Sequence, residues 1–459
     1  MSKRLMVVLA LLFVVGIAFT AYAEVQNVKV SGDIVMSGLS RHKFNLVNSA
    51  ATGSKSQWDQ KLFMSQIRLR VDADLTDNVM ATVRLINERV WNGQNDTAAS
   101  GNDAIGLDLA YVTLKEFLYS PLSLTIGRQE IHFGNGLVMG NAKVITSTAK
   151  VNIPSDLTER KAFDAIRATL NYDPLVLDFI YAKIRQETTV NDTVGDPNGT
   201  RIVSNKDDIN LAGINATYAL TKKTNVSAYY YNKRDNATNG GLPARGKSDQ
   251  VNTVGLLLSS TPIENLTGSL EGAYQFGRNS TSAQDQHKAY ALQAMLDYTF
   301  AKVKTTPKLG ASYTYLSGNR SAHGADNAGW DPMFYDQKLN NITYTLLPFA
   351  NMSVFNLKAS CKPMDDVTLF ANFGSYDVAQ ERNTANLVSP FTYNGTNTYL
   401  TSARTGRKHL GDALDLTVTY DYTEDVQLAL TGGWFAPGPA LTVNDKSATQ
   451  LIGSMKVTF

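Results

Sequence analysis

The chain has almost no cysteine and little charge. Of its 459 residues one is cysteine, Cys361, and 18% are charged, against about 25% in average proteins. A single cysteine excludes a disulfide framework and a cysteine-rich metal site, and it leaves no room for a Cys-x-x-Cys-His haem motif. The formal net charge of +2 excludes the strongly basic surface expected of a general nucleic-acid-binding protein.

The N-terminal residues have the pattern of a secretory signal peptide. Lys3 and Arg4 precede a largely apolar run over residues 5–19, and residues 21–23 provide an Ala-x-Ala cleavage site. A membrane-anchoring helix is the alternative, but the run is short and wrongly flanked for one. We expect residues 1–23 to be a signal peptide and residues 24–459 to be one mature domain, with equal numbers of acidic and basic side chains.

No later segment approaches the roughly 20 apolar residues of a spanning helix, so a mature chain in a membrane has to be a closed β-barrel. Residues 63–75 fit a strand of such a barrel, because apolar residues occupy the odd positions. The charges occupy the even positions and therefore share one face of the strand: Arg68, Arg70, Asp72 and Asp74. The run is longer than the mean strand of about 5–6 residues, and residues 266–276 repeat the alternation.

The same alternation predicts 18 strands along the chain. They lie near residues 28–36, 63–75, 79–91, 106–116, 122–133, 161–172, 175–185, 208–220, 224–234, 250–261, 265–278, 287–299, 306–317, 349–362, 366–377, 409–421, 425–436 and 449–459. Connections after even-numbered strands are tight turns. The largest connections follow odd-numbered strands, at 37–62, 134–160, 186–207, 318–348 and 378–408.

This segregation of connection lengths is typical of a single transmembrane antiparallel β-barrel of the bacterial outer membrane, with short periplasmic turns and long extracellular loops. A secreted β-sandwich also alternates, but it has no reason to separate short turns from long loops. The fold class is therefore predicted as all-β, and the membrane lipid is an expected partner. The C-terminal residues 455–459 end in an aromatic, which resembles the C-terminal signal of outer-membrane proteins.

Two bands of aromatic residues are expected at the two membrane interfaces. The band beside the short turns consists of Phe117, Tyr119, Tyr172, Tyr218, Tyr298, Phe300, Tyr420 and Tyr422. The band toward the long loops consists of Trp91, Phe133, Tyr181, Tyr231, Tyr274, Phe276, Tyr315, Tyr376 and Trp434.

The polar faces of the strands should line the interior, because a charge facing lipid costs about 2–4 kcal/mol at the midplane. Alternation places these charged residues inside: Arg68, Arg70, Asp72, Asp74, Arg84, Glu88, Arg167, Glu271, Asp297, Lys358, Asp415 and Lys456. Two interpretations stay open. The arginines of early strands form a basic wall opposite Asp297 and Asp415 and select solutes, or the charges neutralise one another and stiffen the wall.

Eighteen strands enclose an aqueous channel unless something blocks it. The connections 134–160 and 318–348 are the best candidates for a constriction, because both are rather apolar for exposed loops. The second contains Trp330, Asp331 and Phe334 in a segment with four large apolar or aromatic residues. Packing of these loops on the outer surface is the alternative.

Several segments resemble the alginate-export family of bacterial outer-membrane porins. They are residues 124–129 (Leu-Thr-Ile-Gly-Arg-Gln), 134–140, 160–167 (Arg-Lys-Ala-Phe-Asp-Ala-Ile-Arg), 330–335, 410–416 and 432–438. The resemblance spans about residues 60–459 and implies an 18-stranded barrel with periplasmic termini that passes a solute across the outer membrane. A polyanionic solute would need a basic path, for which it implies the pore-lining residues Arg68, Arg70, Arg128, Arg160 and Arg167.

Three other functions are open to test. An outer-membrane hydrolase would need a nucleophile near a histidine, and His409 has Asp412 nearby but no Gly-x-Ser-x-Gly motif, so we expect no enzyme. A barrel that sheathes a periplasmic partner, such as a multihaem cytochrome in an electron conduit, is the alternative function. No cofactor is expected, although acidic pairs in the loops leave calcium binding open: Asp96 and Asp103, or Asp192 and Asp196.

The sequence therefore predicts an outer-membrane porin for diffusion or export of small or polyhydroxylated solutes, including oligosaccharides, through a charged aqueous lumen. The mixed charge of the predicted lumen and the neutral mature chain favour such solutes over a polyanion.

Overall fold

The computed structural model describes residues 27–44, 46, 59–91, 105–142, 154, 156–185, 190–192, 201–203, 208–235, 249–278, 286–319, 326–381, 387–393, 396–400, 406–441 and 446–459. The predicted signal peptide lies outside these residues. Its cleavage, and with it the division into a signal peptide and one mature domain, stays a prediction.

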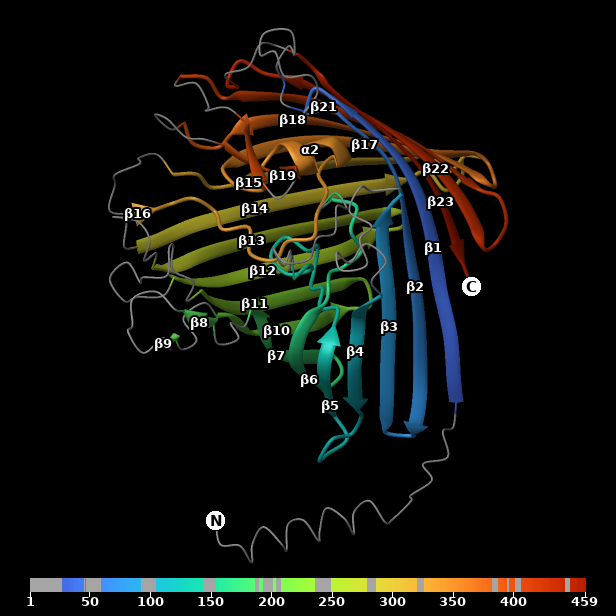
Figure 1. The fold of residues 1–459 in the computed structure, drawn as a ribbon, viewed down its shortest axis with the longest axis vertical. Helices are drawn as coiled ribbons and strands as arrows, with labels where there is room; N and C mark the ends of the chain where they lie inside the picture. Colours follow the sequence, from blue (N-terminus) through green and yellow to red (C-terminus); the bar gives the residue numbers. More distant parts are fainter. Residues whose placement is uncertain are drawn as a thin grey trace, which may run out of the picture.

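Eighteen long antiparallel strands form one sheet that closes on itself (Figure 1). They are β1 (Asn27–His42), β2 (Gln60–Thr76), β3 (Val79–Val90), β4 (Gly106–Leu114), β5 (Leu122–Gln129), β6 (Phe163–Asn171), β7 (Leu175–Arg185), β10 (Ile209–Thr221), β11 (Thr224–Asp235), β12 (Asp249–Ile263), β13 (Leu266–Arg278), β14 (Gln286–Thr299), β15 (Lys308–Leu316), β17 (Met352–Met364), β18 (Val367–Val378), β21 (His409–Asp421), β22 (Val426–Pro437) and β23 (Ala448–Thr458).

Each strand pairs with its neighbours in this order, and β1 pairs with β23 to close the barrel. The two strands lie side by side at the right of Figure 1. The prediction of an 18-stranded antiparallel barrel is confirmed. The largest differences from the predicted boundaries are at two strand ends: β1 continues past residue 36 to His42, and β5 ends at Gln129 instead of residue 133.

The long connections contain the remaining elements. These are the short strands β8 (Val190–Asp192), β9 (Arg201–Val203), β16 (Asp326–Asn327), β19 (Leu387–Tyr393) and β20 (Thr396–Leu400), and the helix α2 (Asn341–Leu346). Two pairs of them form small separate sheets, β8 with β9 and β19 with β20. In the part of the chain that the structure describes, no helix is long and apolar enough to cross a membrane.

Side chains alternate across the wall of the barrel, with apolar groups outside and polar groups inside. On β2, Ile67 and Leu69 are 43% and 41% exposed on the outer side, whereas Gln66 on the inner side is 4% exposed. On β13, Leu270 is likewise exposed and Glu271 is buried. This arrangement suits a wall between hydrocarbon and water.

The hydrophobic core lies inside the barrel, where segments of the long connections pack against the inner wall. Ile131, Leu137 and Met139 of the connection after β5 belong to it, together with Phe334 and Ile342 of the connection after β15. Wall residues that point inward complete the core, among them Phe163, Tyr231, Val354, Tyr376 and Phe435. The loops therefore fold into the barrel at the long-loop end.

The aromatic band beside the short turns lies on the outer side, because all eight of its predicted residues are exposed. In the second band three predictions are wrong: Phe133, Tyr231 and Tyr376. Tyr231 and Tyr376 are buried on the inner side, and Phe133 stacks on Tyr231. These rings pack under the infolded loops and are therefore buried inside the barrel instead of lying at the lipid interface.

The seam between β1 and the C-terminus leaves no space for a side chain at Gly32. A Cβ there would lie 2.4 Å from the backbone oxygen of Arg68 and 2.7 Å from Cζ of Phe459. We expect Gly32→Val to lower the free energy of unfolding by about 1–3 kcal/mol, as overpacking does. Urea unfolding, followed by the heat-modifiable shift of the folded barrel in gels, measures the change.

Gly432→Val on β22 is the matched control, since a Cβ at Gly432 meets no atom within 4 Å. The control should unfold at the wild-type urea concentration. Equal midpoints for Gly32→Val and wild type would show that the seam is not close-packed.

Candidate functional site

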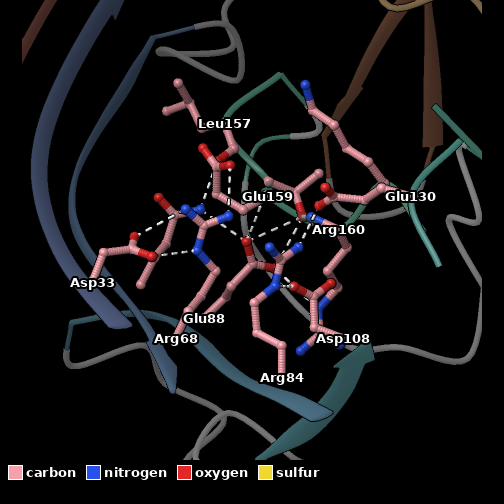
Figure 2. A network of polar contacts seen from close by, with 12 residues as sticks. Asp33, Arg68, Arg84, Glu88, Asp108, Glu130, Leu157, Glu159 and Arg160 are labelled. Carbon is pink, nitrogen blue, oxygen red and sulfur yellow. Dashed lines mark hydrogen bonds and ion pairs between the residues drawn. The ribbon is translucent and has the colours of Figure 1, made fainter. Parts of the chain in front are cut away.

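The inner wall of β1–β4 carries a network of arginines and carboxylates (Figure 2). Arg68 donates to both carboxylate oxygens of Asp33 over 2.8 and 3.0 Å, and its third nitrogen reaches Glu159 at 3.2 Å. Arg84 donates to Asp108 over 2.6 Å and contacts Glu130. The bidentate pairing of Arg68 with Asp33 fixes the position of its guanidinium group.

Glu88 connects this network to the connection before β6. It accepts hydrogen bonds from the Thr158 hydroxyl at 2.9 Å, from the Glu159 amide at 2.8 Å and from Nε of Arg160 at 3.1 Å. Gln66 of β2 donates to the same carboxylate over 2.8 Å. Figure 2 shows the result: Arg68, Arg84 and Arg160 face the five carboxylates of Asp33, Glu88, Asp108, Glu130 and Glu159. Acidic groups outnumber basic ones in this cluster.

Two further arginines on the inner wall have carboxylate partners nearby. Arg70 binds Asp72 on its own strand over 2.7 and 2.9 Å. Arg167 of β6 binds Asp178 of β7 over 2.8 Å, and its guanidinium lies 5.2 Å from the centre of the Phe133 ring. Asp74 lies two residues from Asp72 on the same side of β2, half-buried, near the short-turn rim.

Arg41 is an inner arginine that the sequence prediction missed. Its side chain is fully buried, it contacts Asp156, and it donates to Gln450 over 2.8 Å. The sequence predicts a first strand that ends at residue 36, and Arg41 lies beyond that end. The sequence prediction also missed the inner carboxylates Asp33 and Asp178. Both lie within predicted strands, so the alternation of side chains along those strands could have identified them.

Arg128 lies on the outer side of the wall, so its prediction as a pore-lining residue is wrong. The register pairs Arg128 with Asp164, two residues along from the pair of Ile126 with Ile166, and both isoleucines are exposed on the outer side. Its guanidinium binds the Asp164 carboxylate at 3.0 Å, and that side chain is 60% exposed. Alternation from Ile126 dictates this side.

The inward acidic residues of the later strands do not form one acidic wall. Glu271 is buried and accepts a hydrogen bond from the Tyr229 hydroxyl at 2.8 Å. Asp297 lies 3.7 Å from the ammonium of Lys308. Asp415 is buried beneath α2, as described below.

The predicted constriction residues lie in the infolded connection after β15. Trp330 and Phe334 are buried, and Phe334 packs edge-to-face on Phe163 of β6. Asp331 contacts Lys233, and its backbone exchanges two hydrogen bonds with the Gln275 amide over 2.8 and 2.9 Å.

Asp331 is held in its ionised form. Burial raises the pKa of this carboxyl group, but the nearby ammonium of Lys233 and its hydrogen bond outweigh that effect, helped by the Met333 amide. The pKa of Asp331 is therefore below its ordinary value. The contribution of the ion pair to stability is present above the unfolded-state pKa and is lost only as the pH falls through the lowered value.

The two infolded connections bind each other inside the barrel. Met139 and Phe334 form a parallel β-bridge, in which the Phe334 amide donates to Val138 over 3.0 Å and the Asn141 amide donates to Phe334 over 2.9 Å. Lys161 and Asp336 add an ion pair of 2.8 Å. Segments far apart in the sequence thus form one unit across the lumen. Its role as the constriction of the pore stays a prediction.

A cluster of asparagines and Asp415 fastens α2 to the wall. The Asp415 carboxylate accepts from the Asn341 amide at 2.7 Å and from the Asn340 side chain at 2.9 Å. Asn340 also donates to the Asn372 backbone over 2.8 Å and accepts from Asn356 at 2.9 Å. Asp415 therefore acts as an anchor for a loop, a role that no spacing in the sequence indicates.

Hydroxyl groups on the inner wall bond to one another and to carboxylates. Cross-strand pairs join Thr113 to Thr125, Thr217 to Ser227 and Thr417 to Thr431, with oxygen–oxygen distances of 3.1, 3.0 and 3.0 Å. Others bond to inward carboxylates, as Thr82 does to Asp72 and Thr169 to Asp178. Each hydroxyl both donates and accepts hydrogen bonds.

A metal site is not evident in the described residues, which hold no group of three or more potential histidine, cysteine or carboxylate ligands. Asp96, Asp103 and Asp196 lie outside those residues, and only the backbone of Asp192 is described. Calcium binding in the loops therefore stays a prediction.

Comparison with known proteins identifies the family. The profile of the family described as alginate export matches residues 35–453. The chain belongs to the alginate export family. No curated protein sequence matches it significantly. The resemblance in the sequence is thus confirmed, and the chain is an outer-membrane channel. The alternative of a sheath around a multihaem cytochrome is not favoured.

Solved structures of porins share the fold of this family member. Pseudomonas aeruginosa OpdQ has 14% identity and a TM-score of 0.55, over 95% of this chain and 99% of that one. P. aeruginosa OccK2 (OpdF) in complex with glucuronate has 12% identity and a TM-score of 0.54, over 95% and 99%. A BenF-like porin from Pseudomonas fluorescens Pf-5 has 11% identity and a TM-score of 0.55, over 95% and 100%.

Loss of the Asp415 carboxylate should loosen α2. Asp415→Ala leaves the donors of Asn340 and Asn341 without a buried acceptor, at a cost of about 1–3 kcal/mol. We expect single channels of this variant in planar bilayers to fluctuate more often between conductance levels than wild-type channels do. Asp297→Ala is the control, because the carboxylate of Asp297 lies beside Lys308 of the wall and not beside α2. Equally quiet traces from both variants would contradict the anchoring role.

Proposed function

We propose that this channel conducts small polyhydroxylated solutes, sugars and sugar acids, with little preference between anions and cations. One observation carries the proposal: the arginines on the inner wall are paired with carboxylates. The pairs are Arg41 with Asp156, Arg68 with Asp33, Arg70 with Asp72, Arg84 with Asp108, Arg160 with Glu88 and Arg167 with Asp178.

These pairs argue against a polyanionic cargo. A polyuronate chain is drawn along a path of cations whose charge is not neutralised nearby. Here each guanidinium already has a carboxylate within ion-pairing distance, and an anionic solute would have to compete with it. The acidic excess around Arg68 and Arg84 opposes anions further. Of the two interpretations of the lumen charges, the neutralising network has this support.

The hydroxyl-bearing inner wall favours solutes that are themselves rich in hydroxyl groups. Pairs such as Thr113 with Thr125 and Thr417 with Thr431 can exchange one partner for a solute hydroxyl at little cost, because the hydrogen-bond count is preserved. The two connections that meet across the lumen reduce the room for a large solute. Small sugars and their acids meet both conditions, and glucuronate in the related fold of OccK2 is of this size and kind.

We further propose that His409, the histidine with an acidic neighbour in the sequence, has no catalytic role. The ring of His409 contacts two carboxylates, Asp377 at 3.0 Å and Asp412 at 3.3 Å. Among the described residues neither ring nitrogen has a hydroxyl or thiol partner that it could activate, as nucleophilic catalysis requires.

Ion selectivity in planar bilayers tests the charge balance. We expect wild-type channels in a salt gradient to give a reversal potential near zero or slightly on the cation side. Arg84→Gln removes one cation and leaves Asp108 and Glu130 without their partner, so it should raise the cation-to-anion permeability ratio roughly twofold.

Arg128→Gln is the matched control for this experiment. It removes the same charge, but from the outer side of the wall, where ions do not pass. We expect the wild-type reversal potential for it. A strongly anion-selective wild type, or the same shift for both variants, would contradict the proposed function.

A further inference from the structure

The outer side of β12–β15 has a hollow at Gly272. A Cβ at this glycine would meet no atom within 4 Å, and the register places it between Leu256 and Leu292. The groove around it has a volume of about 850 Å³. Leucines and tyrosines form its walls: Leu256, Leu292, Tyr274, Tyr290, Tyr313 and Tyr315.

The groove faces the membrane and not the lumen. Leu256 and Tyr290 are 55% and 51% exposed on the outer side, and Tyr290 stacks on Tyr315. The strands concerned are adjacent in Figure 1 and belong to the wall that crosses the membrane. Hydrocarbon chains are the apolar material that meets such a wall.

A row of basic side chains lies beyond the groove at the long-loop end. Arg234, Gln250 and Arg278 are register partners across β11, β12 and β13. Lys288 of β14 pairs with Phe276, two residues before Arg278. Alternation from the exposed Tyr230, Phe276 and Tyr290 puts the three cations on the outer side.

The spacing between groove and cations fits a membrane lipid. Gly272 and Arg278 are six residues apart on β13, about 20 Å along a strand that rises about 3.4 Å per residue. With a tilt of about 40°, this is about 15 Å along the membrane normal, which is half the thickness of the hydrocarbon core. A chain in the groove therefore ends at the level of the basic row.

We propose that this face binds a phosphorylated lipid of the outer leaflet, with an acyl chain over Gly272 and phosphate groups on Arg278, Lys288 and Arg234. Arginine and lysine side chains at the headgroup level are suited to bind phosphate. The same face is less suited to a second copy of the chain, because a two-fold contact would bring Arg278 and Lys288 against one another. The site is on the outer wall and is independent of the conducted solute.

Native mass spectrometry of the folded full-length protein in detergent tests this site. The probes are bis-phosphorylated lipid A and the same lipid without its phosphates. We expect wild type to retain the phosphorylated lipid about tenfold better. The double variant Arg278→Gln/Lys288→Gln should lose this preference. Gly272→Leu fills the groove and should lower the retention of both lipids.

Two control variants separate the site from general effects. Lys222→Gln/Lys223→Gln removes the same charge from the exposed turn between β10 and β11 at the opposite rim. Gly432→Leu fills another open outward position, on β22, away from Arg278 and Lys288. Both should retain lipid like wild type, and all variants should keep the wild-type conductance.

Several results would overturn the proposal. Equal retention of both lipids by wild type would exclude phosphate recognition, and equal losses in the test and control variants would exclude this location. A change in oligomeric mass on Gly272→Leu, with lipid retention unchanged, would assign the groove to a second copy of the chain. The folded state of each variant is checked by its heat-modifiable migration in gels.

Discussion

Closure of the sheet between β1 and β23 is the constraint on which the other features of this protein depend. A strand that faces hydrocarbon can satisfy its backbone polar groups only by pairing with other strands, and a closed sheet has no unpaired edge. The wall then has one apolar side and one wet side, so the charged residues near the middle of the strands face the interior. There they approach one another closely, and pairs such as Arg68 with Asp33 and Arg84 with Asp108 are the consequence.

The sequence predicts this architecture well because the membrane imposes a simple period of two on each strand. Residues 63–75 and 266–276 show it over lengths greater than those of most globular strands, and β2 and β13 follow it. The lengths of the connections can likewise be read directly from the sequence. Tight turns and long connections alternate along the chain, which predicts that consecutive strands are neighbours in the barrel. The inward side of Arg68, Arg84 and Glu271 follows from the same alternation.

Contacts between distant segments could not be predicted in this way. The binding of Phe334 to Met139, and of Asn340 to Asp415, depends on how two long connections fold into the barrel. The sequence places Tyr231 and Tyr376 at the lipid interface, because the infolded loops that cover these rings leave no periodic signal. Arg128 shows the opposite case: the family resemblance suggested the pore, while alternation from Ile126 already indicated the outer side.

The central claim is that a charge-compensated, hydroxyl-rich lumen passes small polyhydroxylated solutes without strong charge selection. Swelling of liposomes that contain the folded protein tests it most directly, with glucose and glucuronate supplied at equal osmolarity. Similar initial rates for the neutral sugar and for its acid are expected, together with no measurable entry of an alginate chain. Much faster entry of glucuronate than of glucose, or entry of the polymer, would contradict the account.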